Sequence, residues 1–204
     1  MDRFRAAFTV LFATFAVIRA YYRIKARGNT LRKVQEKWLV PAEVLLGLPF
    51  MLGGLLYIFH PQPLESTSVA IGAAWRWAGA GIFAASLILL TWAHADLGKN
   101  FSAELRIRTD HELVTGGLYR HVRHPMYTFF FFLVIGMGLL SANWLIGTGG
   151  VCAFIVIVSL RLHKEEEMMA TRFGERYRQY AAVTGRFLPR LRKRSMQDLG
   201  RAAF

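Results

Sequence analysis

Two stretches of the chain hold the residue types best suited to chemistry. The first covers 96–127, is rich in histidine, tyrosine, glutamate and glycine, and ends in Arg123-His-Pro-Met-Tyr127. The second begins at Arg161, with Glu165 four residues later, so that on a helix the two side chains share one face. An arginine can hold a carboxylate through two parallel hydrogen bonds, which a lysine cannot copy. The pattern indicates a pocket that binds a charged ligand.

Several common kinds of site lack their sequence signatures. The chain has no G-x-x-x-x-G-K-[ST] phosphate loop, no G-x-G-x-x-G after a strand, no G-x-S-x-G turn and no H-E-x-x-H motif. His121 and His124 have the spacing of a metal pair, but no third ligand follows at a convincing spacing. Cys152 is the single cysteine, which excludes an internal disulfide. We therefore expect no metal site and no dinucleotide-binding fold.

Five apolar stretches must position these residues. Hydrophobic residues make up 54% and charged residues 19% of the 204 residues, which is more apolar than a soluble domain. A helix needs about 20 apolar residues to cross a bilayer, and it satisfies its own backbone there. We therefore predict an all-α, polytopic integral membrane protein with about five transmembrane helices. The apolar stretches cover 6–22, 38–59, 69–92, 126–140 and 144–160.

The last two helices are expected to bring the two reactive stretches together. Only Ser141, Ala142 and Asn143 separate them, so they should form an antiparallel hairpin. Pro125 suits the first turn of the fourth helix, and His124 stands directly before it. The start of the fourth helix and the end of the fifth then lie at one membrane face, where we expect a pocket with apolar walls and a polar mouth.

The positive charge is distributed as in a membrane protein. The formal net charge is +13, and all 26 Lys and Arg except Arg3, Arg5 and Arg76 lie in three segments. These segments are 19–37, 94–123 and the tail from Arg161. With five spans they fall on one side, which the positive-inside rule makes the cytoplasm, and the N-terminus lies outside. No basic run carries interleaved base-stacking aromatics, so we expect no nucleic-acid partner.

Some of these features also fit simpler roles. Charged and aromatic side chains at helix ends often anchor a protein at the membrane interface, which is an alternative for each candidate residue taken alone. Arg76 interrupts the third apolar stretch, where snorkelling and pairing with Glu43 are equally compatible with the sequence. The stretch 164–182 has helical spacing of Met, Phe and Tyr, and either lies on the membrane or packs on the bundle.

A family resemblance is carried by motifs on both sides of the expected hairpin. They are His111-Glu-Leu-Val-Thr, Gly117-Leu-Tyr119, the pentapeptide at 123–127, Phe173-Gly-Glu-Arg-Tyr177 and Gly185-Arg-Phe-Leu-Pro189. Over about 97–189 the chain resembles the isoprenylcysteine carboxyl methyltransferase family, and phospholipid N-methyltransferases share a looser version of the pattern. The resemblance implies a five-helix membrane enzyme that uses S-adenosylmethionine and releases S-adenosylhomocysteine. It also implies a cytosolic cofactor pocket, enclosed by the loop before the fourth helix and the C-terminal tail.

The resemblance assigns roles to particular residues. Arg161 matches the arginine that binds the substrate carboxylate, and it is the residue we expect to be catalytic. Glu104 stands where eukaryotic members have a glutamine that touches the cofactor. Backbone N–H groups of 111–114 are expected to hold the cofactor's carboxylate, and Tyr119 or Tyr127 to face its cation. The full expected cofactor-binding set is Glu104, His111, Glu112, Leu113, Val114, Tyr119, His124, Pro125, Met126, Tyr127, Glu165 and Glu166.

The resemblance also implies a reaction. We expect carboxyl O-methylation of a prenylated cysteine or a similar lipophilic acid, reached from the bilayer at the cytosolic face. The alternatives are N-methylation of a phosphatidylethanolamine-type phospholipid and a non-enzymatic membrane protein of the same superfamily. Membrane lipids are expected partners, and no obligate protein partner is evident. The membrane would be the inner membrane of a prokaryote or the endoplasmic reticulum of a eukaryote.

The chain is expected to form one structural domain with two regions. Residues 1–93 hold the first three transmembrane helices. Residues 94–204 form the catalytic region, which comprises the cytosolic loop, the helical hairpin and the helical tail.

Overall fold

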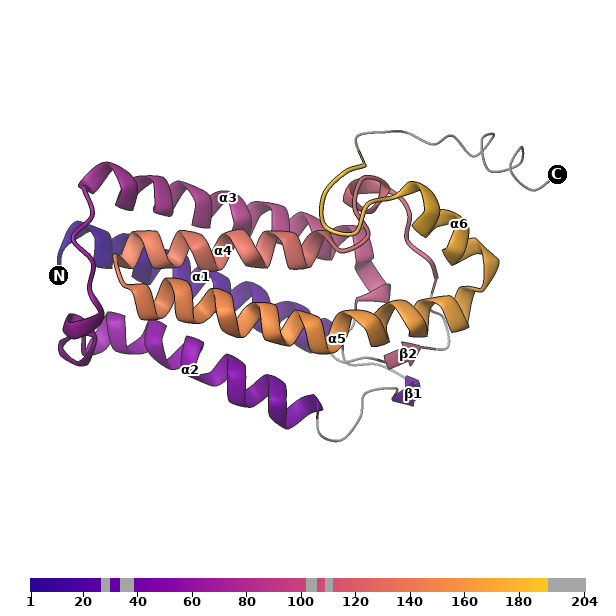
Figure 1. Cartoon of the computed structure of the whole chain (residues 1–204), viewed down its shortest axis with the longest axis horizontal. Helices are drawn as coiled ribbons and strands as arrows, with labels where there is room; N and C mark the ends of the chain where they lie inside the picture. Colours follow the sequence, from indigo (N-terminus) through magenta and orange to yellow (C-terminus); the bar gives the residue numbers. More distant parts are fainter. Residues whose placement is uncertain (27–29, 34–38, 102–105, 109–111, 191–204) are drawn as a thin grey trace.

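The computed structural model describes residues 1–26, 30–33, 39–101, 106–108 and 112–190. Within them, five helices run side by side as a bundle, and a shorter helix lies beyond one end of it (Figure 1). The bundle helices are α1 (Arg3–Lys25), α2 (Leu39–Phe59), α3 (Ala73–Leu97), α4 (Pro125–Ser141) and α5 (Gly150–Phe173). The shorter helix is α6 (Glu175–Val183). The predicted helical hairpin is α4 and α5, joined through the left-handed residue Ala142 and a π-helical turn (Leu145–Gly149).

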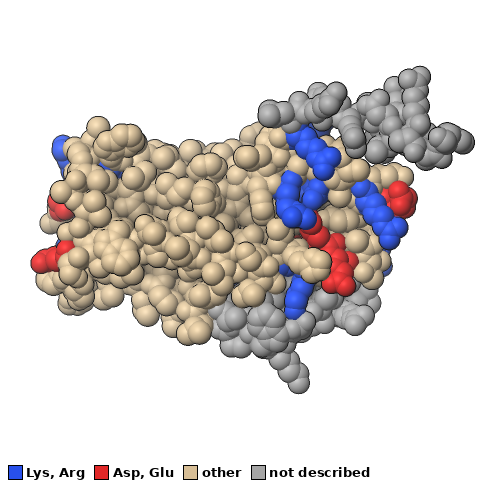
Figure 2. Space-filling view, in the orientation of Figure 1, with Lys and Arg blue, Asp and Glu red and all other residues tan. Residues whose placement is uncertain are grey.

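The bundle helices have the composition of membrane spans. By length and hydropathy, α1, α3 and α5 are each able to cross a bilayer. Val44–Phe59 of α2 and the whole of α4 are shorter apolar helices. Figure 2 shows a broad uncharged band over the helices on one face, with charged side chains gathered toward the two ends. The chain is a polytopic helical membrane protein, and the predicted fold class is confirmed.

A stripe of phenylalanines joins α1 to the rest of the bundle. Phe4, Phe8, Phe12 and Phe15 are spaced three or four residues apart, lie on one helix face and are all buried. Phe8 packs against α2 through Tyr57 and against α3 through Phe83, with ring centroids 4.7 and 6.3 Å apart. Large aromatic surfaces therefore fix the position of α1.

Helices α3 and α4 form the most extensive contact in the bundle, and glycine allows their close approach. A Cβ placed on Gly79 of α3 would lie 2.6 Å from Leu139 Cβ and from the Leu140 backbone nitrogen of α4. A Cβ on Gly136 of α4 would lie 2.7 Å from the backbone nitrogen of Phe83. Gly79 and Gly136 therefore allow the backbones of α3 and α4 to pack closely.

The two ends of the bundle are tied by backbone hydrogen bonds between loops. At one end, strand β1 (Thr30–Lys33), which follows α1, pairs antiparallel with strand β2 (Arg106–Arg108), which precedes α4. This end also carries α6, and we call it the basic end (Figure 1). At the opposite end, the nitrogen of Val69 donates to the carbonyl of Ala142 at 2.8 Å, which joins the α2–α3 loop to the hairpin turn. The β1–β2 ribbon was not predicted, because its strands are too short to show a period.

Arg76 is a structural arginine at the opposite end. Its Nε donates to the carbonyl of Leu140 at 3.0 Å, and its Nη2 donates to the Tyr57 hydroxyl at 3.0 Å. Its guanidinium also lies over the ring of Phe4, 3.9 Å from the centroid. These contacts join α1, α2, α3 and α4, and they explain why an arginine interrupts the third apolar stretch. The Glu43 side chain lies outside the described residues.

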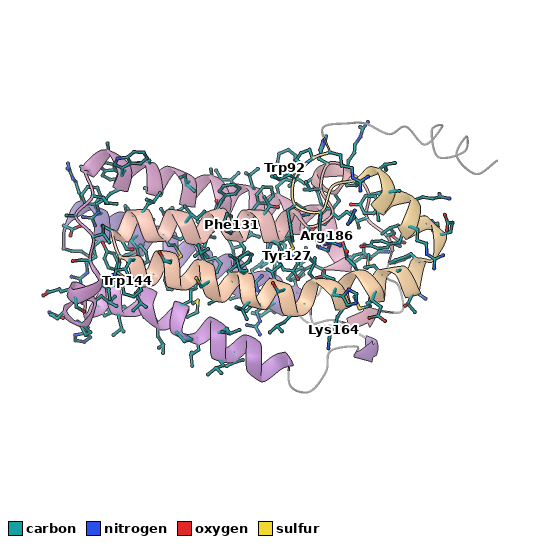
Figure 3. The ribbon with its side chains drawn as sticks, viewed as in Figure 1. Trp92, Tyr127, Phe131, Trp144, Lys164 and Arg186 are labelled. Carbon is teal, nitrogen blue, oxygen red and sulfur yellow. The ribbon has the colours of Figure 1, made fainter. Side chains whose placement is uncertain are left out.

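Tryptophans mark both ends of the apolar band. Trp144 lies at the opposite end, near the turn between α4 and α5, and Trp92 lies toward the basic end of α3 (Figure 3). Both side chains are exposed, with 51% and 54% of their surface accessible. Tryptophan is enriched at both membrane interfaces, so these positions are consistent with a span that runs between them.

We predict that Gly79→Ala lowers the apparent melting temperature of the detergent-purified protein, because the new methyl group meets the backbone of α4. Overpacking of this kind costs about 1–3 kcal/mol. Gly81→Ala is the matched control, since nothing lies within 4 Å of a Cβ at that position of the same helix. Thermal unfolding followed by tryptophan fluorescence measures both. Equal melting of the two variants would contradict the close approach.

Candidate functional site

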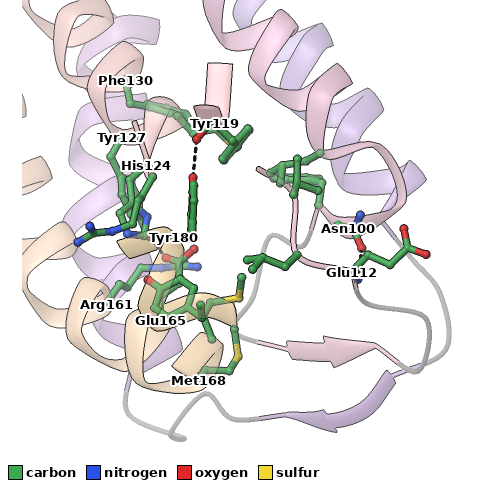
Figure 4. A pocket seen from close by; sticks show the side chains of 18 of the residues that line it. Asn100, Glu112, Tyr119, His124, Tyr127, Phe130, Arg161, Glu165, Met168 and Tyr180 are labelled. Atoms are coloured by element: carbon green, nitrogen blue, oxygen red, sulfur yellow. Dashed lines mark hydrogen bonds between the residues drawn. The ribbon is translucent and has the colours of Figure 1, made fainter. Parts of the chain in front are cut away.

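A cavity of about 190 Å³ lies at the basic end of the bundle. It is enclosed by the ends of α1 and α3, the stretch 112–127, the basic-end half of α5 and the start of the tail. Figure 4 shows Arg161 and Glu165 on one side of the cavity and Asn100 with Glu112 on the other. Apolar and aromatic side chains form most of its wall, with a few polar groups among them, as in sites for small molecules.

Helix α5 presents Arg161 and Glu165 to this cavity from one face, as their spacing predicts. Tyr127, in the first turn of α4, donates a hydrogen bond from its hydroxyl to Glu165 Oε2 at 2.6 Å. Tyr127 also interacts with Arg161. Met168 is buried one turn further along α5 and lines the same cavity. The hairpin therefore brings the two reactive stretches together.

Asp96, near the end of α3, holds the loop that carries Tyr119. Its Oδ2 accepts a hydrogen bond from the Leu118 backbone nitrogen at 2.8 Å. Gly117 has a φ of +56°, and the space beside its Cα is taken by the Asp96 carboxylate, so a side chain at this position is excluded. The Tyr119 carbonyl accepts a hydrogen bond from the Tyr180 hydroxyl of α6. The loop is thus fixed from the bundle on one side and from the tail on the other.

Asn100 fixes the opposite wall. Its Oδ1 accepts a hydrogen bond from the Glu112 backbone nitrogen at 2.8 Å. This N–H is one of those expected to hold the cofactor's carboxylate, and that role stays a prediction. The Glu112 side chain forms an exposed ion pair with Lys99 at 3.1 Å, which contributes little to stability.

Glu166 joins the loop, α4 and the tail behind the cavity wall. Its Oε1 accepts from Arg123 Nη2 at 2.9 Å and lies 3.3 Å from His124 Nε2, while Oε2 pairs with Arg186. Only 9% of the Arg123 side chain and 16% of the Glu166 side chain are exposed. Arg123 also donates to the carbonyls of Ala181 and Thr184, both at 2.7 Å. The tail is therefore held by a largely buried charge network.

The structure brings most of the candidate residues together. Those that line the cavity are Glu112, Leu113, Val114, Tyr119, His124, Met126, Tyr127, Arg161 and Glu165. Pro125 is buried in the first turn of α4, and neither it nor Glu166 lines the cavity. Glu104 and His111 lie outside the described residues. The cofactor-binding roles of these residues remain predictions.

Sequence reasoning missed part of the lining. The additional residues are Arg19, Leu97, Asn100, Phe101, Arg123, Phe130, Met168, Met169, Tyr177 and Tyr180. A signal was present for Tyr177 and Tyr180, whose helical spacing left open whether the stretch packs on the membrane or on the bundle. The stretch contributes Met168 and Tyr177, both buried, and it packs on the bundle and its loop.

A second and larger cavity of about 680 Å³ adjoins the first. It lies between α1, α2, α4 and α5, and its walls are mainly apolar side chains such as Phe50, Met51, Phe154 and Ile157. The two cavities share four lining residues, which are Arg19, Tyr127, Phe130 and Arg161. We call this second cavity the apolar groove. It connects the charged site with the interior of the bundle.

The fold and these cavities define a polytopic membrane protein with a ligand site at the basic end of its helical hairpin. Residues 79–171, a little under half of the chain, match the model of the isoprenylcysteine carboxyl methyltransferase family, so this part of the chain is similar to that family.

Relatives and a solved structure show the same similarity. The chain is 33% identical over 90 residues to the protein-S-isoprenylcysteine O-methyltransferase of Schizosaccharomyces pombe, covering 43% of this chain and 38% of that protein. It is 31% identical over 84 residues to a nickel-cobalt-cadmium resistance protein of Alcaligenes xylosoxydans, covering 41% and 39%. A structure of a eukaryotic intramembrane Ras methyltransferase superposes with a TM-score of 0.53 at 25% identity, covering 76% of this chain and 53% of the other. The chain thus spans less than half the length of these two relatives.

We predict that Glu166→Gln loosens the tail, because it leaves Arg123 without its carboxylate in a largely buried position. Breaking one partner of a buried pair costs about 3–5 kcal/mol, and the partial exposure of Arg186 places this case at the low end. A lower melting temperature and faster protease cleavage after 174 are the expected results. Glu167→Gln, at an exposed neighbour, is the control. Unchanged proteolysis in Glu166→Gln would contradict the role of the charge network.

Proposed function

We propose that the protein is an S-adenosylmethionine-dependent methyltransferase that methylates the carboxylate of a prenylated cysteine or a similar lipophilic acid. The observation that carries the proposal is the position of Arg161. This side chain lines both the first cavity, beside Glu165 and Tyr127, and the apolar groove. The names of the S. pombe relative and of the solved structure support a methyltransferase.

The donor set of the first cavity fits this cofactor. Glu165 accepts one hydrogen bond from Tyr127 and has capacity for an amino group. Leu113, Val114 and Met168 offer apolar contact, and aromatic rings are suited to face a cation. When bound, S-adenosylmethionine supplies a methyl group on a positively charged sulfur.

The acceptor would be oriented by Arg161, with its lipid chain in the apolar groove. A carboxyl group has a pKa near 4, so the acceptor is already ionised at neutral pH and needs no general base. The contribution of the protein is then orientation of the carboxylate and exclusion of water by the loop and tail. Arg161 provides the paired hydrogen bonds that fix both carboxylate oxygens.

The tyrosines around the cavity do not supply a base for N-methylation of a phospholipid amine. An amine must lose a proton before it attacks. Burial raises the pKa of Tyr119 well above 10, and burial raises the pKa of Tyr177 to about 12, so neither is a base at neutral pH. His124 lies against Glu166 rather than free in the cavity. A carboxylate acceptor avoids this requirement.

We further propose that the basic end faces the cytosol and that the N-terminus lies outside. The segments 19–37 and 94–123 and the tail carry nearly all Lys and Arg. The β1–β2 ribbon joins the first two of these segments at one end of the bundle, which supports a common side.

The first test is calorimetric titration of S-adenosylhomocysteine into the detergent-purified protein. We expect micromolar binding, reduced at least tenfold in Glu165→Ala, because a hydrogen bond to a charged group contributes about 1.5–3 kcal/mol. Glu167→Ala keeps wild-type affinity, since Glu167 is exposed and does not line the cavity. Absence of binding by folded wild-type protein would refute the methyltransferase and favour a non-enzymatic role.

The second test concerns Arg161. Arg161→Ala should lower kcat/KM for a prenylcysteine acid about 100-fold or more, while Arg161→Lys recovers only part, because a lysine lacks the planar pair of donors. His163→Ala, at an exposed position of the same helix, should retain activity. Methyl transfer to phosphatidylethanolamine that survives Arg161→Ala would instead support the N-methyltransferase.

A further inference from the structure

Arg19 lies on the buried face of α1 although it is a charged residue within an apolar helix. It follows Phe8, Phe12 and Phe15 at spacings of four, three and four residues, and these phenylalanines are all buried in the bundle. A residue that continues this stripe faces the other helices rather than lipid. The position of Arg19 is therefore directed by the fold and is not that of an interfacial anchor.

The surroundings of Arg19 are positive and aromatic. Its guanidinium lies over the ring of Phe130 on α4, 5.1 Å from the centroid. Arg161 lines both cavities together with Arg19, and Arg23 lines the apolar groove, so two further positive side chains lie nearby. Among the described residues, no carboxylate forms an ion pair with Arg19. Positive charges gathered in a partly buried site repel one another, and a bound anion relieves this repulsion.

Arg19 also lies where the two cavities meet. It lines both the first cavity and the apolar groove, as does Arg161 of α5, and Arg23 lines only the groove. The junction thus carries arginines from two helices, with apolar walls behind them. A ligand with a negative head and a lipophilic chain matches both parts of this arrangement.

We propose that Arg19 is a second anion-binding residue, which with Arg161 holds the negatively charged head of the acceptor and selects anionic over neutral or cationic lipophiles. This inference rests on the proposed function and extends it to a residue outside the matched region 79–171.

The two arginines would also favour release of the methylated product. On methyl transfer, a carboxylate oxygen forms a bond to the methyl carbon as the carbon–sulfur bond breaks, and the electron pair stays on sulfur. The acceptor changes from an anion to a neutral ester, and no proton is exchanged. The ester can no longer pair with Arg19 and Arg161, so the site binds the acid more tightly than its own product.

The test measures binding directly and does not require turnover. N-acetyl-S-farnesylcysteine and its neutral methyl ester are titrated into the full-length protein in detergent, with tryptophan fluorescence or calorimetry as the readout. Wild type should prefer the acid. Arg19→Gln should weaken acid binding about 10- to 100-fold, the usual contribution of a charge-assisted hydrogen bond, and leave ester binding within twofold.

Two further variants make the result specific. Arg19→Lys keeps the charge and should recover part of the acid affinity, which separates charge from fold. Lys25→Gln removes a positive charge from the exposed end of the same helix, outside both cavities, and should bind like wild type. The affinity for S-adenosylhomocysteine should change less than twofold in all three variants.

Each contrary outcome points to a different error. Undiminished acid binding in Arg19→Gln overturns the inference, and so does a parallel loss of S-adenosylhomocysteine affinity, which would assign Arg19 to the cofactor. If the wild type binds S-adenosylhomocysteine but binds acid and ester equally, the anion site is refuted and the methyltransferase proposal is not. Acid preference that depends on Arg19, without any S-adenosylhomocysteine binding, supports the anion site and refutes the methyltransferase.

Discussion

The carboxylate of Glu166 joins two parts of the chain that are distant in sequence, the start of α4 and the tail. Arg123 precedes α4, His124 caps that helix, and Arg186 belongs to the tail, yet all three converge on two oxygen atoms. Removing these charges from water is tolerable only because they are paired. The same network fixes the back of the cavity wall, since His124 and Arg123 line the cavity on their other side.

The two ends of the bundle are built on different principles. The opposite end relies on Arg76, whose hydrogen bonds and aromatic contact join four helices. The basic end uses ion pairs and the Tyr180–Tyr119 hydrogen bond to hold a loop and a tail around an open space. Close glycine packing between α3 and α4 joins the two ends and leaves little freedom between them. A rigid bundle can therefore support a site that is mostly made from connecting segments.

The sequence predicted what depends on local pattern. Hydropathy located the five helices, and the three-residue gap between the last two predicted the hairpin that unites Arg161 and Tyr127. Contacts between residues that are distant in sequence have no comparable signal in the local pattern. Arg19 was counted among the basic residues of the positive-inside pattern, because periodicity alone does not say which cavity a buried face meets. The different environments of Glu165 and Glu166 were also hidden, since adjacent helix positions point in different directions and only the tail decides what Glu166 meets.

The hydrogen bonds between the tail and the loop have a consequence for biosynthesis. Arg123 and His124 donate their backbone N–H groups to the carbonyls of Gly185 and Arg186, about sixty residues later in the chain. A ribosome therefore delivers all five spans before the segment that completes the cavity emerges. Until then the backbone N–H groups of Arg123 and His124 lack these two carbonyl partners. The segment at 185–186 is therefore synthesised after all five helices, and the nascent chain can complete the cavity wall only at that stage.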